Sequence, residues 1–420
     1  MRLWQLPEAG TGQGDKPEPG AFVLLGGKDV PERKFDNLAE AVQAASEGDT
    51  IEVRGNGPFV GQPMSNNQAL TIRAGAGFRP VIRFDAEGLE ANAALFKPYA
   101  PLVLEGLDLR LVSPDKPSPV GYLLINVTTD APLSIANCRL LADAGCLTCI
   151  SAARSADSVP LRIEIRNSEM FNSWSLGPIV HEGFRMERLV LENCLLRGPQ
   201  PFIAVLYDRE ATAASIRLTR NTFVSAGPSL SFWAMRRLDP DKEGGATPIT
   251  LEASENVFDS QAELFRFDQG EQLVANPLPL PEAKALLQQL LGWRERGNLY
   301  PVGNSLLTWT VEPPPELREV TTLGELQTLE EWNSFWRQTE TSSRVGRPLY
   351  KGAHGKPLDQ VTPQDFRLRR DSPGYRAGED GKDLGADVDL VGPGKAYERW
   401  KQTPEYQEWR VDTGQTKDEG

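Results

Sequence analysis

The residues of this chain that could carry out chemistry gather after a set of short apolar segments. His181 and Glu182 are adjacent, as are Asp208 and Arg209, and these four residues are the best catalytic candidates. An imidazole or a carboxylate can transfer protons near neutral pH, and an arginine can stabilise developing negative charge. No recognisable hydrolase or lyase motif surrounds them, so the catalytic assignment stays open.

A second set of side chains favours ligand binding. Tyr207 and Trp233 offer flat rings for apolar sugar faces, and Arg236 and Asp268 supply charged groups. If the segments that carry them stack on one another, these residues form one groove centred on His181, Tyr207 and Trp233. The alternative is a solvated face on which the aromatic rings only cover strand ends.

The cysteines indicate packing rather than metal binding. Cys146 and Cys149 form a CxxC motif, but there is no second such motif, and both histidines lie far away in the sequence. Cys138 and Cys194 occupy equivalent places in the repeat described next, which predicts buried, unpaired thiols. We therefore predict no bound metal and no cofactor.

A short phrase recurs six times, each time at the end of an apolar strand-like segment. Its marker residues are Gly106, Asn137, Asn167, Asn193, Asn221 and Asn256. They are 31, 30, 26, 28 and 35 residues apart, and units of this size cannot bury an apolar face alone. The repeat predicts an all-β fold, a right-handed parallel β-helix, with an N-terminal capping helix and C-terminal covering helices.

The marker asparagines have a physical role in such a stack. A corner after each strand needs left-handed backbone, which Asn tolerates and Gly adopts without steric cost. Stacked side-chain amides can then hydrogen-bond along the axis. The last two units carry one extra residue before Asn221 and Asn256, which predicts a bulge or a different corner there.

The outward position before each marker predicts a ladder of ion pairs rather than a site. Its residues are Glu105, Ala136, Arg166, Glu192, Arg220 and Glu255. From Arg166 onward the charges alternate in sign, and neighbouring strands lie about 4.8 Å apart. Each charge therefore has an opposite charge beside it.

Composition and charge narrow the classes of partner. The chain has 420 residues and a net charge of −13, and we find no basic stripe, so a nucleic-acid partner is disfavoured. Neither a signal peptide nor a membrane-length apolar run is visible, so we expect no membrane insertion and a cytoplasmic, monomeric protein. If the chain is a fragment of a longer membrane protein, the location becomes extracytoplasmic.

The chain divides into four predicted regions. These are a disordered N-terminus over 1–20, the β-helix over 21–310 with its cap helix at 35–46, C-terminal helices and a closing segment over 311–411, and a disordered tail over 412–420.

Each repeat unit of the β-helix has a second predicted strand after the strand that carries the marker. These strands are Leu123–Val127, Cys149–Ser151, Ile179–His181, Ile203–Tyr207, Leu230–Trp233 and Leu264–Phe267. The later helices are predicted over Pro281–Trp293, Leu323–Thr339 and Ala396–Trp409, the last broken at Pro404.

Three groups of sequence phrases carry a family resemblance. FDNLAEAVQAASEGDTIEV, starting at Phe35, resembles the N-terminal cap of the pectate-lyase-like superfamily of right-handed parallel β-helices. Asp371-Ser372-Pro373 with the segment from Asp380 to Asp387 resembles their closing phrase. GDTIEVRGNGPF and LVGPGKAYERWKQTPEYQEW are similar to β-helix regions appended to bacterial serine/threonine protein kinases. The chain itself contains no kinase motifs.

The resemblance implies two main functions. One is a non-catalytic binding or sensor module that recognises a polysaccharide or protein, as the accessory region of a kinase signalling protein. The other is a polysaccharide lyase or glycoside hydrolase, since the superfamily includes enzymes that cleave acidic polysaccharides with calcium sites or paired carboxylates. A purely structural spacer is the third possibility.

Overall fold

The computed structural model describes most of the chain. The described residues are 19–25, 31–85, 93–112, 122–142, 148–152, 161–172, 179–182, 186–200, 202–206, 215–234, 249–270, 276–311, 320–338, 342–352 and 355–415. The segments predicted to be disordered lie mainly outside these ranges. The predicted tail nevertheless starts too early, because Asp412 still belongs to a helix and Gln415 is buried.

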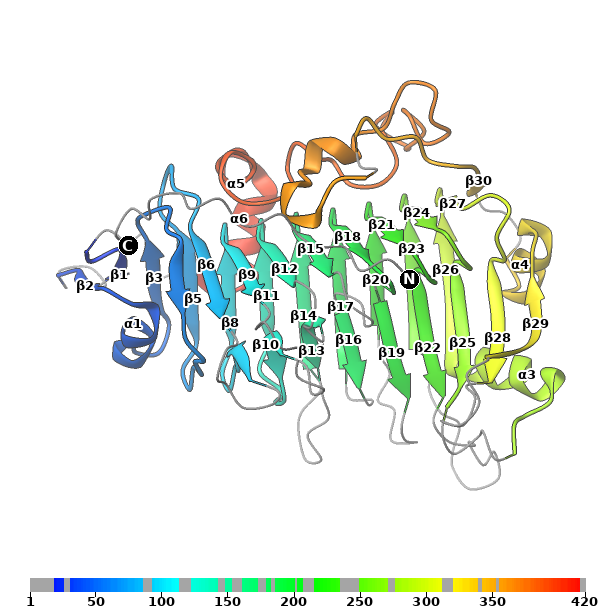
Figure 1. Ribbon diagram of the computed structural model, residues 1–420, viewed down its shortest axis with the longest axis horizontal. Coiled ribbons are helices and arrows are strands. Elements are labelled where there is room, and N and C mark those ends of the chain that lie inside the picture. The colour runs from blue at the N-terminus through cyan, green and yellow to red at the C-terminus, as the bar shows by residue number, and fades with distance from the viewer. Residues whose placement is uncertain are drawn as a thin grey trace.

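Three long sheets form the body of the molecule, with 11, 10 and 9 strands, and almost all neighbouring strands are parallel (Figure 1). Sheet A contains β1 (Phe22–Leu25), β2 (Arg33–Phe35), β3 (Asp49–Val53), β5 (Leu70–Ala74), β8 (Leu102–Glu105), β11 (Leu133–Ala136), β14 (Leu161–Arg166), β17 (Met186–Glu192), β20 (Ser215–Thr219), β23 (Ile249–Ser254) and β26 (Leu291–Arg296). Sheet B contains β4 (Phe59–Gly61), β6 (Val81–Asp85), β9 (Asp108–Val112), β12 (Arg139–Ala142), β15 (Glu169–Asn172), β18 (Leu195–Gly198), β21 (Thr222–Ser225), β24 (Val257–Ser260), β27 (Leu299–Tyr300) and β30 (Arg344–Val345). Sheet C contains β7 (Ala94–Phe96), β10 (Leu123–Val127), β13 (Thr148–Ala152), β16 (Ile179–Glu182), β19 (Phe202–Leu206), β22 (Leu230–Ala234), β25 (Phe265–Gln269), β28 (Leu307–Val311) and β29 (Thr321–Leu326).

The chain visits sheets A, B and C in turn, and we call each such passage a coil. The marker strands lie in sheet A, and the predicted second strands lie in sheet C. Two strands per coil were expected, but from β5 to β28 each coil has three, because a short strand of sheet B follows every strand of sheet A. Five of these strands, β12, β15, β18, β21 and β24, have only four residues, so their alternation was too brief to stand out.

The corners between sheets A and B use left-handed backbone, as predicted, but not always at the asparagine. Asn137, Asn167 and Asn193 have φ angles of 50°, 49° and 54°. In the next two coils the left-handed residues are Arg220 and Glu255, with φ angles of 55° and 54°. The extra residue in those units therefore moves Asn221 and Asn256 one position onward, to the inside of the stack.

The asparagines consequently form two rows of amides instead of one. At the corner, Asn193 Nδ2 donates to Asn167 Oδ1 at 2.6 Å. Inside, Asn221 Nδ2 donates to Asn256 Oδ1 and Asn256 Nδ2 donates to Asn298 Oδ1, both at 3.0 Å. The backbone N–H of Asn221 also donates to Asn256 Oδ1, at 2.8 Å. Amide ladders along the axis are thus confirmed, with the second row extended to Asn298.

Apolar side chains from all three sheets fill the interior of the stack. Aromatic rings on successive coils lie over one another: Phe223 and Phe258 are stacked at 4.9 Å, and Phe258 and Tyr300 at 5.6 Å. Cys138 and Cys194 are buried and not in disulfides, as predicted, and burial raises the pKa of each thiol to about 12. Cys149 is also buried, and Cys146 lies outside the described residues.

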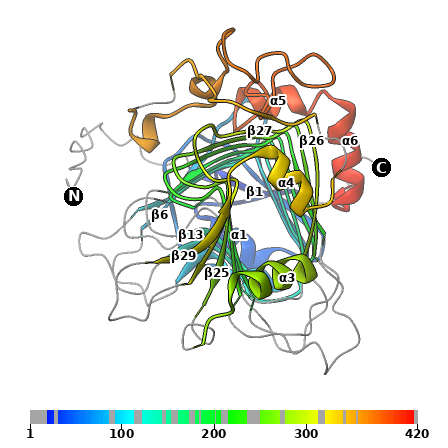
Figure 2. The same ribbon diagram turned by 90° about the vertical axis from the view of Figure 1, so that its right-hand side faces the viewer.

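Helices close both ends of the stack (Figures 1 and 2). Helix α1 (Leu38–Ala44) covers the first coils, and Asn37 caps it by accepting a hydrogen bond from the Glu40 N–H. Helix α3 (Leu280–Leu290) and helix α4 (Leu329–Phe335) lie at the other end. Both are shorter than predicted, since the predicted helices run into strands β26 and β29.

The rest of the chain, residues 342–352 and 355–415, forms a segment that we call the C-terminal strap. It runs back along the outside of the stack and carries two short 3-10 turns (Leu358–Gln360 and Pro363–Phe366), then α5 (Lys395–Trp400) and α6 (Pro404–Asp412) (Figure 1). The break at Pro404 is confirmed. These last helices were expected at the far end and flank of the stack, but they pack on Ala74, Val103 and Ala136 of sheet A near its beginning.

Glu105 anchors α5 and α6 to the stack. Its side chain is fully buried and accepts hydrogen bonds from Tyr397 Oη at 2.6 Å, Trp409 Nε1 at 2.7 Å and Gln415 Nε2 at 2.7 Å. The prediction that Glu105 belongs to a ladder of ion pairs is therefore wrong, because neutral donors occupy its carboxylate. Only some neighbouring residues of the predicted ladder form ion pairs, such as Arg166 and Glu192, whose Nη1 and Oε2 atoms are 3.6 Å apart.

A buried ion pair holds the middle of the strap against sheet B. Arg139 Nη1 contacts Glu169 Oε2 at 2.9 Å and also donates to the carbonyl of Val361 in the strap at 2.8 Å. Burial, with the nearby Asp108 carboxylate, raises the pKa of Glu169 to about 7 despite the opposing effect of Arg139.

No helix in the described part of the chain is both long and apolar enough to cross a membrane.

Candidate binding pocket

The structure describes only part of the site predicted from the sequence. His181 and Glu182 end strand β16 of sheet C, but their side chains are outside what is described. Tyr207, Asp208, Arg209 and Arg236 also lie outside the described residues. The proposed catalytic group therefore stays a prediction.

Trp233 and Asp268 are neighbours on the outer face of sheet C. They are directly paired in the register of β22 and β25. Trp233 is partly exposed, between Phe232 and Ala234, which both point into the core. Asp268 is buried and accepts a hydrogen bond from the Thr310 hydroxyl. Trp233 thus faces outward, as a ligand-binding role requires, whereas Asp268 is already engaged.

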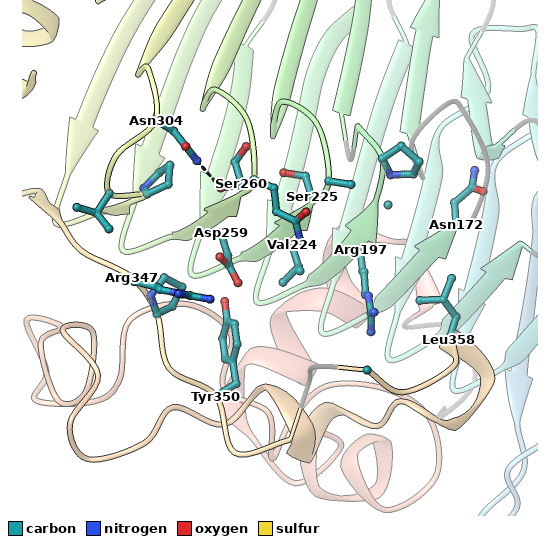
Figure 3. Close-up of a pocket in the computed structure, with 18 residues that line it drawn as sticks. Asn172, Arg197, Val224, Ser225, Asp259, Ser260, Asn304, Arg347, Tyr350 and Leu358 are labelled. Carbon is teal, nitrogen blue, oxygen red and sulfur yellow. Dashed lines mark hydrogen bonds between the residues drawn. The ribbon is translucent and has the colours of Figure 1, made fainter. Parts of the chain in front are cut away.

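A polar pocket of about 840 Å³ lies elsewhere, between the outer face of sheet B and the C-terminal strap (Figure 3). Sheet B and its corners contribute one wall over several successive coils, and the strap contributes the other. The lining residues are Asn172, Arg197, Gly198, Pro199, Val224, Ser225, Ala226, Asp259, Ser260, Gln261, Pro301, Val302, Asn304, Arg347, Pro348, Tyr350, Gly355 and Leu358.

The floor of the pocket is a row of residues in register on adjacent strands. Arg197, Val224 and Asp259 are paired from β18 to β21 to β24. Each is the fourth residue after its left-handed corner, at a position that alternation turns outward. Burial lowers the pKa of the Arg197 guanidinium, so this cation is partly desolvated.

The opposite wall brings Tyr350 and Arg347 of the strap toward Asp259 (Figure 3). Tyr350 is buried, and burial together with the adjacent Asp259 carboxylate raises its pKa well above the usual value. The phenol is therefore neutral and cannot act as a base near pH 7. Arg347 is exposed at the pocket, and no ion pair involving it occurs within the described residues.

Hydrogen bonds hold the loops at the rim of the pocket. Asn304 Nδ2 donates to the Ser260 carbonyl at 2.7 Å, and the hydroxyls of Ser225 and Ser229 are 3.1 Å apart. The Ser260 hydroxyl donates to the backbone carbonyl of Glu263 at 2.7 Å. The rim is thus preorganised before any ligand arrives.

The arrangement suits binding better than acid–base catalysis. Asp259 is the one carboxylate among the lining residues, while glycoside hydrolysis needs two. Within the described residues, no three His, Cys, Asp or Glu side chains come together as a metal site. Two guanidinium groups, amides and hydroxyls instead offer hydrogen bonds to hydroxyl and carboxylate groups.

Sequence reasoning missed this pocket because it missed sheet B. A signal was present, since the fourth residue after each corner forms an outward series. That series begins Arg110, Leu141 and Phe171 and changes to Arg197, Val224 and Asp259. The strap's contribution could not be found this way, because Arg347 and Tyr350 are far from sheet B in sequence.

Comparison with known protein families and curated sequences identifies no relative of this chain. No family model matches the chain, and no curated protein matches its sequence.

Proposed function

We propose that this chain is a right-handed parallel β-helix of the pectate-lyase-like type that acts as a non-catalytic binding module. Its ligand is an oligosaccharide segment bearing carboxylates, held in the pocket between sheet B and the strap. The observation that carries this proposal is the convergence of Arg197 and Arg347 on one long polar pocket. The role as accessory region of a serine/threonine kinase protein rests only on the sequence phrases that resemble such regions.

The length of the pocket favours a linear ligand. Its lining runs from Asn172 on β15 to Pro301 after β27, which is four coil steps. With strands about 4.8 Å apart, these steps cover about 19 Å. A compact metabolite would fill only part of that length, whereas several linked sugar units would extend along it.

The chemistry of the wall favours a sugar over a peptide. Extended peptides bind chiefly to open sheet edges, where backbone groups are free to pair. Here the ligand would lie on the face of sheet B, whose backbone groups already bond to neighbouring strands. Recognition must therefore come from side chains, and guanidinium, amide and hydroxyl groups match the carboxylates and hydroxyls of an acidic sugar.

A glycan array followed by calorimetry on the hits tests the proposal. Arg347→Gln removes an exposed cation from the pocket, and we expect it to weaken binding of an acidic oligosaccharide about tenfold. Arg188→Gln is the matched control, because Arg188 is an exposed arginine on sheet A. Both variants should retain the wild-type melting temperature.

Three outcomes would overturn the proposal or change it. Equal binding by wild type and Arg347→Gln would exclude the pocket. Loss of binding only when Trp233 and Tyr207 are replaced by Ala would move the site to sheet C. Release of reducing ends or unsaturated products from a hit would replace the binding module with a hydrolase or lyase.

A further inference from the structure

The first half of the C-terminal strap, residues 342–378, is basic, although the chain as a whole is acidic. Residues 342–378 contain eight Lys and Arg against three Asp, whereas the whole chain has a net charge of −13. At physiological salt a charge acts over about 8 Å, so a ligand at the strap senses these cations more than the distant carboxylates. The strap is therefore locally suited to anions.

An antiparallel bridge within the strap gathers several of its cations. Tyr350 and Leu368 form this bridge, with both side chains buried against sheet B. Hydrogen bonds from Lys351 N to the Arg367 carbonyl at 3.0 Å and from Arg369 N to the Leu349 carbonyl at 2.8 Å flank it. Because neighbouring residues alternate in direction, Lys351 and Arg367 both point away from the sheet, opposite each other. Like charges in opposed positions are destabilising unless something compensates them.

These cations line a pocket of about 490 Å³ on the outer side of the strap. Its lining contains Lys351, Arg367, Arg369 and Arg370, with only Asp371 and Asp383 as carboxylates. It is separate from the sheet B pocket, with which it shares no residue.

Two of the four cations are already paired. Arg369 contacts Asp371 at 2.7 Å, and Arg367 contacts Asp389 at 2.7 Å. Lys351 and Arg370 are exposed, and neither takes part in an ion pair within the described residues.

The balance of charge defines the ligand. Asp371 and Asp389 pair with Arg369 and Arg367, so Lys351 and Arg370 are the two cations left for a ligand, beside the single carboxylate of Asp383. Two available cations match a phosphate monoester of charge −1.5 to −2 better than a carboxylate of charge −1. The planar fork of an arginine can bind two phosphate oxygens, and a lysine ammonium can reach a third. Asp383 Oδ1 accepts the backbone N–H of Arg376 at 2.9 Å, which turns part of its acceptor capacity away from a ligand.

We infer that the outer pocket of the strap is a second binding site, specific for a phosphate monoester, with Lys351 and Arg370 as its principal ligand-binding residues. The phosphate belongs either to a small phosphorylated metabolite or to a phosphorylated side chain of a protein. This inference does not depend on the sheet B pocket or its ligand.

Calorimetry with phenyl phosphate, and with benzoate as the monoanionic comparison, tests the site. We expect saturable binding of phenyl phosphate, at least tenfold weaker binding of benzoate, and about a tenfold loss of phenyl phosphate affinity in Lys351→Gln/Arg370→Gln. The control is Arg83→Gln/Arg188→Gln, which removes the same charge from exposed positions on sheets B and A. It should change the affinity less than twofold.

The outcomes separate a site from general electrostatic attraction. Equal losses in the two double variants, no saturable binding by the wild type, or equal affinity for benzoate would each overturn the inference. Should the first double variant show a lowered melting temperature, Arg370→Lys keeps the charge but loses the fork, and must weaken binding about threefold. A phosphoserine peptide and glucose 6-phosphate, titrated in parallel, then distinguish the two sources of the phosphate.

Discussion

The attachment of the C-terminal helices to sheet A depends on one carboxylate, that of Glu105. Replacing Glu105 with Ala removes the common acceptor of the Tyr397 hydroxyl, the Trp409 indole N–H and the Gln415 amide, which donate at 2.6, 2.7 and 2.7 Å. All three donors would lose this acceptor at a buried site, and the Gln415 amide would keep only the Thr413 hydroxyl, at 2.9 Å. We therefore expect α5 and α6 to detach far more often in this variant.

The size of the effect follows from the hydrogen bonds and the burial. A buried donor without a partner costs about 1–3 kcal/mol. A hydrogen bond to a charged acceptor contributes about 1.5–3 kcal/mol net of desolvation, so the lower limit for three such bonds is about 4 kcal/mol. We expect a net loss of about 4 kcal/mol for Glu105→Ala. Glu105→Gln keeps one acceptor oxygen, so we expect about 2 kcal/mol.

Amide hydrogen exchange measures this loss locally. Peptides from 395–415 should exchange about a thousandfold faster in Glu105→Ala, the equivalent of about 4 kcal/mol. Peptides from the core strands should change much less. The control is Glu187→Ala, because Glu187 forms an exposed ion pair with Arg162, with side chains 42% and 62% exposed. Exposed pairs of this kind contribute at most about 1 kcal/mol.

If Glu105→Ala and Glu187→Ala give the same exchange rates over 395–415, the carboxylate does not hold the helices. Apolar packing of Trp400 and Trp409 on Val103 would then suffice for the attachment.

Three further predictions concern buried polar groups. Burial raises the pKa of Glu169 from 4.5 to about 7, so protonated Glu169 contributes fully to stability below pH 4.5, and this contribution is lost as the pH rises through 7. The free energy of unfolding in urea should therefore fall by about 3 kcal/mol over this pH range, and Glu169→Gln should abolish the fall. Asn256→Ala leaves the buried backbone N–H of Asn221 without its acceptor and should lower the free energy of unfolding by about 2–4 kcal/mol in the same assay. Asn67→Ala, at an exposed position, is the control and should lower it by less than about 0.5 kcal/mol. Cys138 and Cys194 should resist a thiol reagent at pH 8 until the protein unfolds, because burial raises the pKa of both thiols to about 12. Rapid labelling of either thiol in the native protein would contradict their placement in the core.

The sequence was sufficient to predict the stacked strands, because the repeated marker combines two independent constraints. Left-handed corners restrict the residue type, and apolar alternation restricts the direction of each side chain. The sheet A and sheet C strands were therefore predicted nearly residue for residue, as for β10 at Leu123–Val127. The corner itself was misplaced in two coils, since Arg220 and Glu255 are not residue types that favour left-handed backbone.

The strap and the pockets could not be predicted from local patterns. The contacts that place the strap join residues far apart in the chain, such as Asn137 Nδ2 and the Leu390 carbonyl, 2.6 Å apart. No periodicity encodes such a pairing. The strap converts ordinary outward residues of sheet B into one wall of a pocket, so the site appears only once the whole chain is arranged in space.

The path of the strap has a consequence for how the protein folds. Successive strap residues contact successive corners in reverse order: the backbone N–H groups of Gly385, Ala386, Asp387 and Gly392 donate to Glu255, Thr222, Asn193 and Asn167. If one coil were skipped or added, the corners would no longer match these spacings. The strap, which is synthesised after the coils, therefore fits only a stack with the correct number of coils. These contacts join residues far apart in the chain, 164 residues for Ala386 with Thr222 and 194 for Asp387 with Asn193. Their formation must therefore be late and slow, and the strap completes the fold only after the coils are in place.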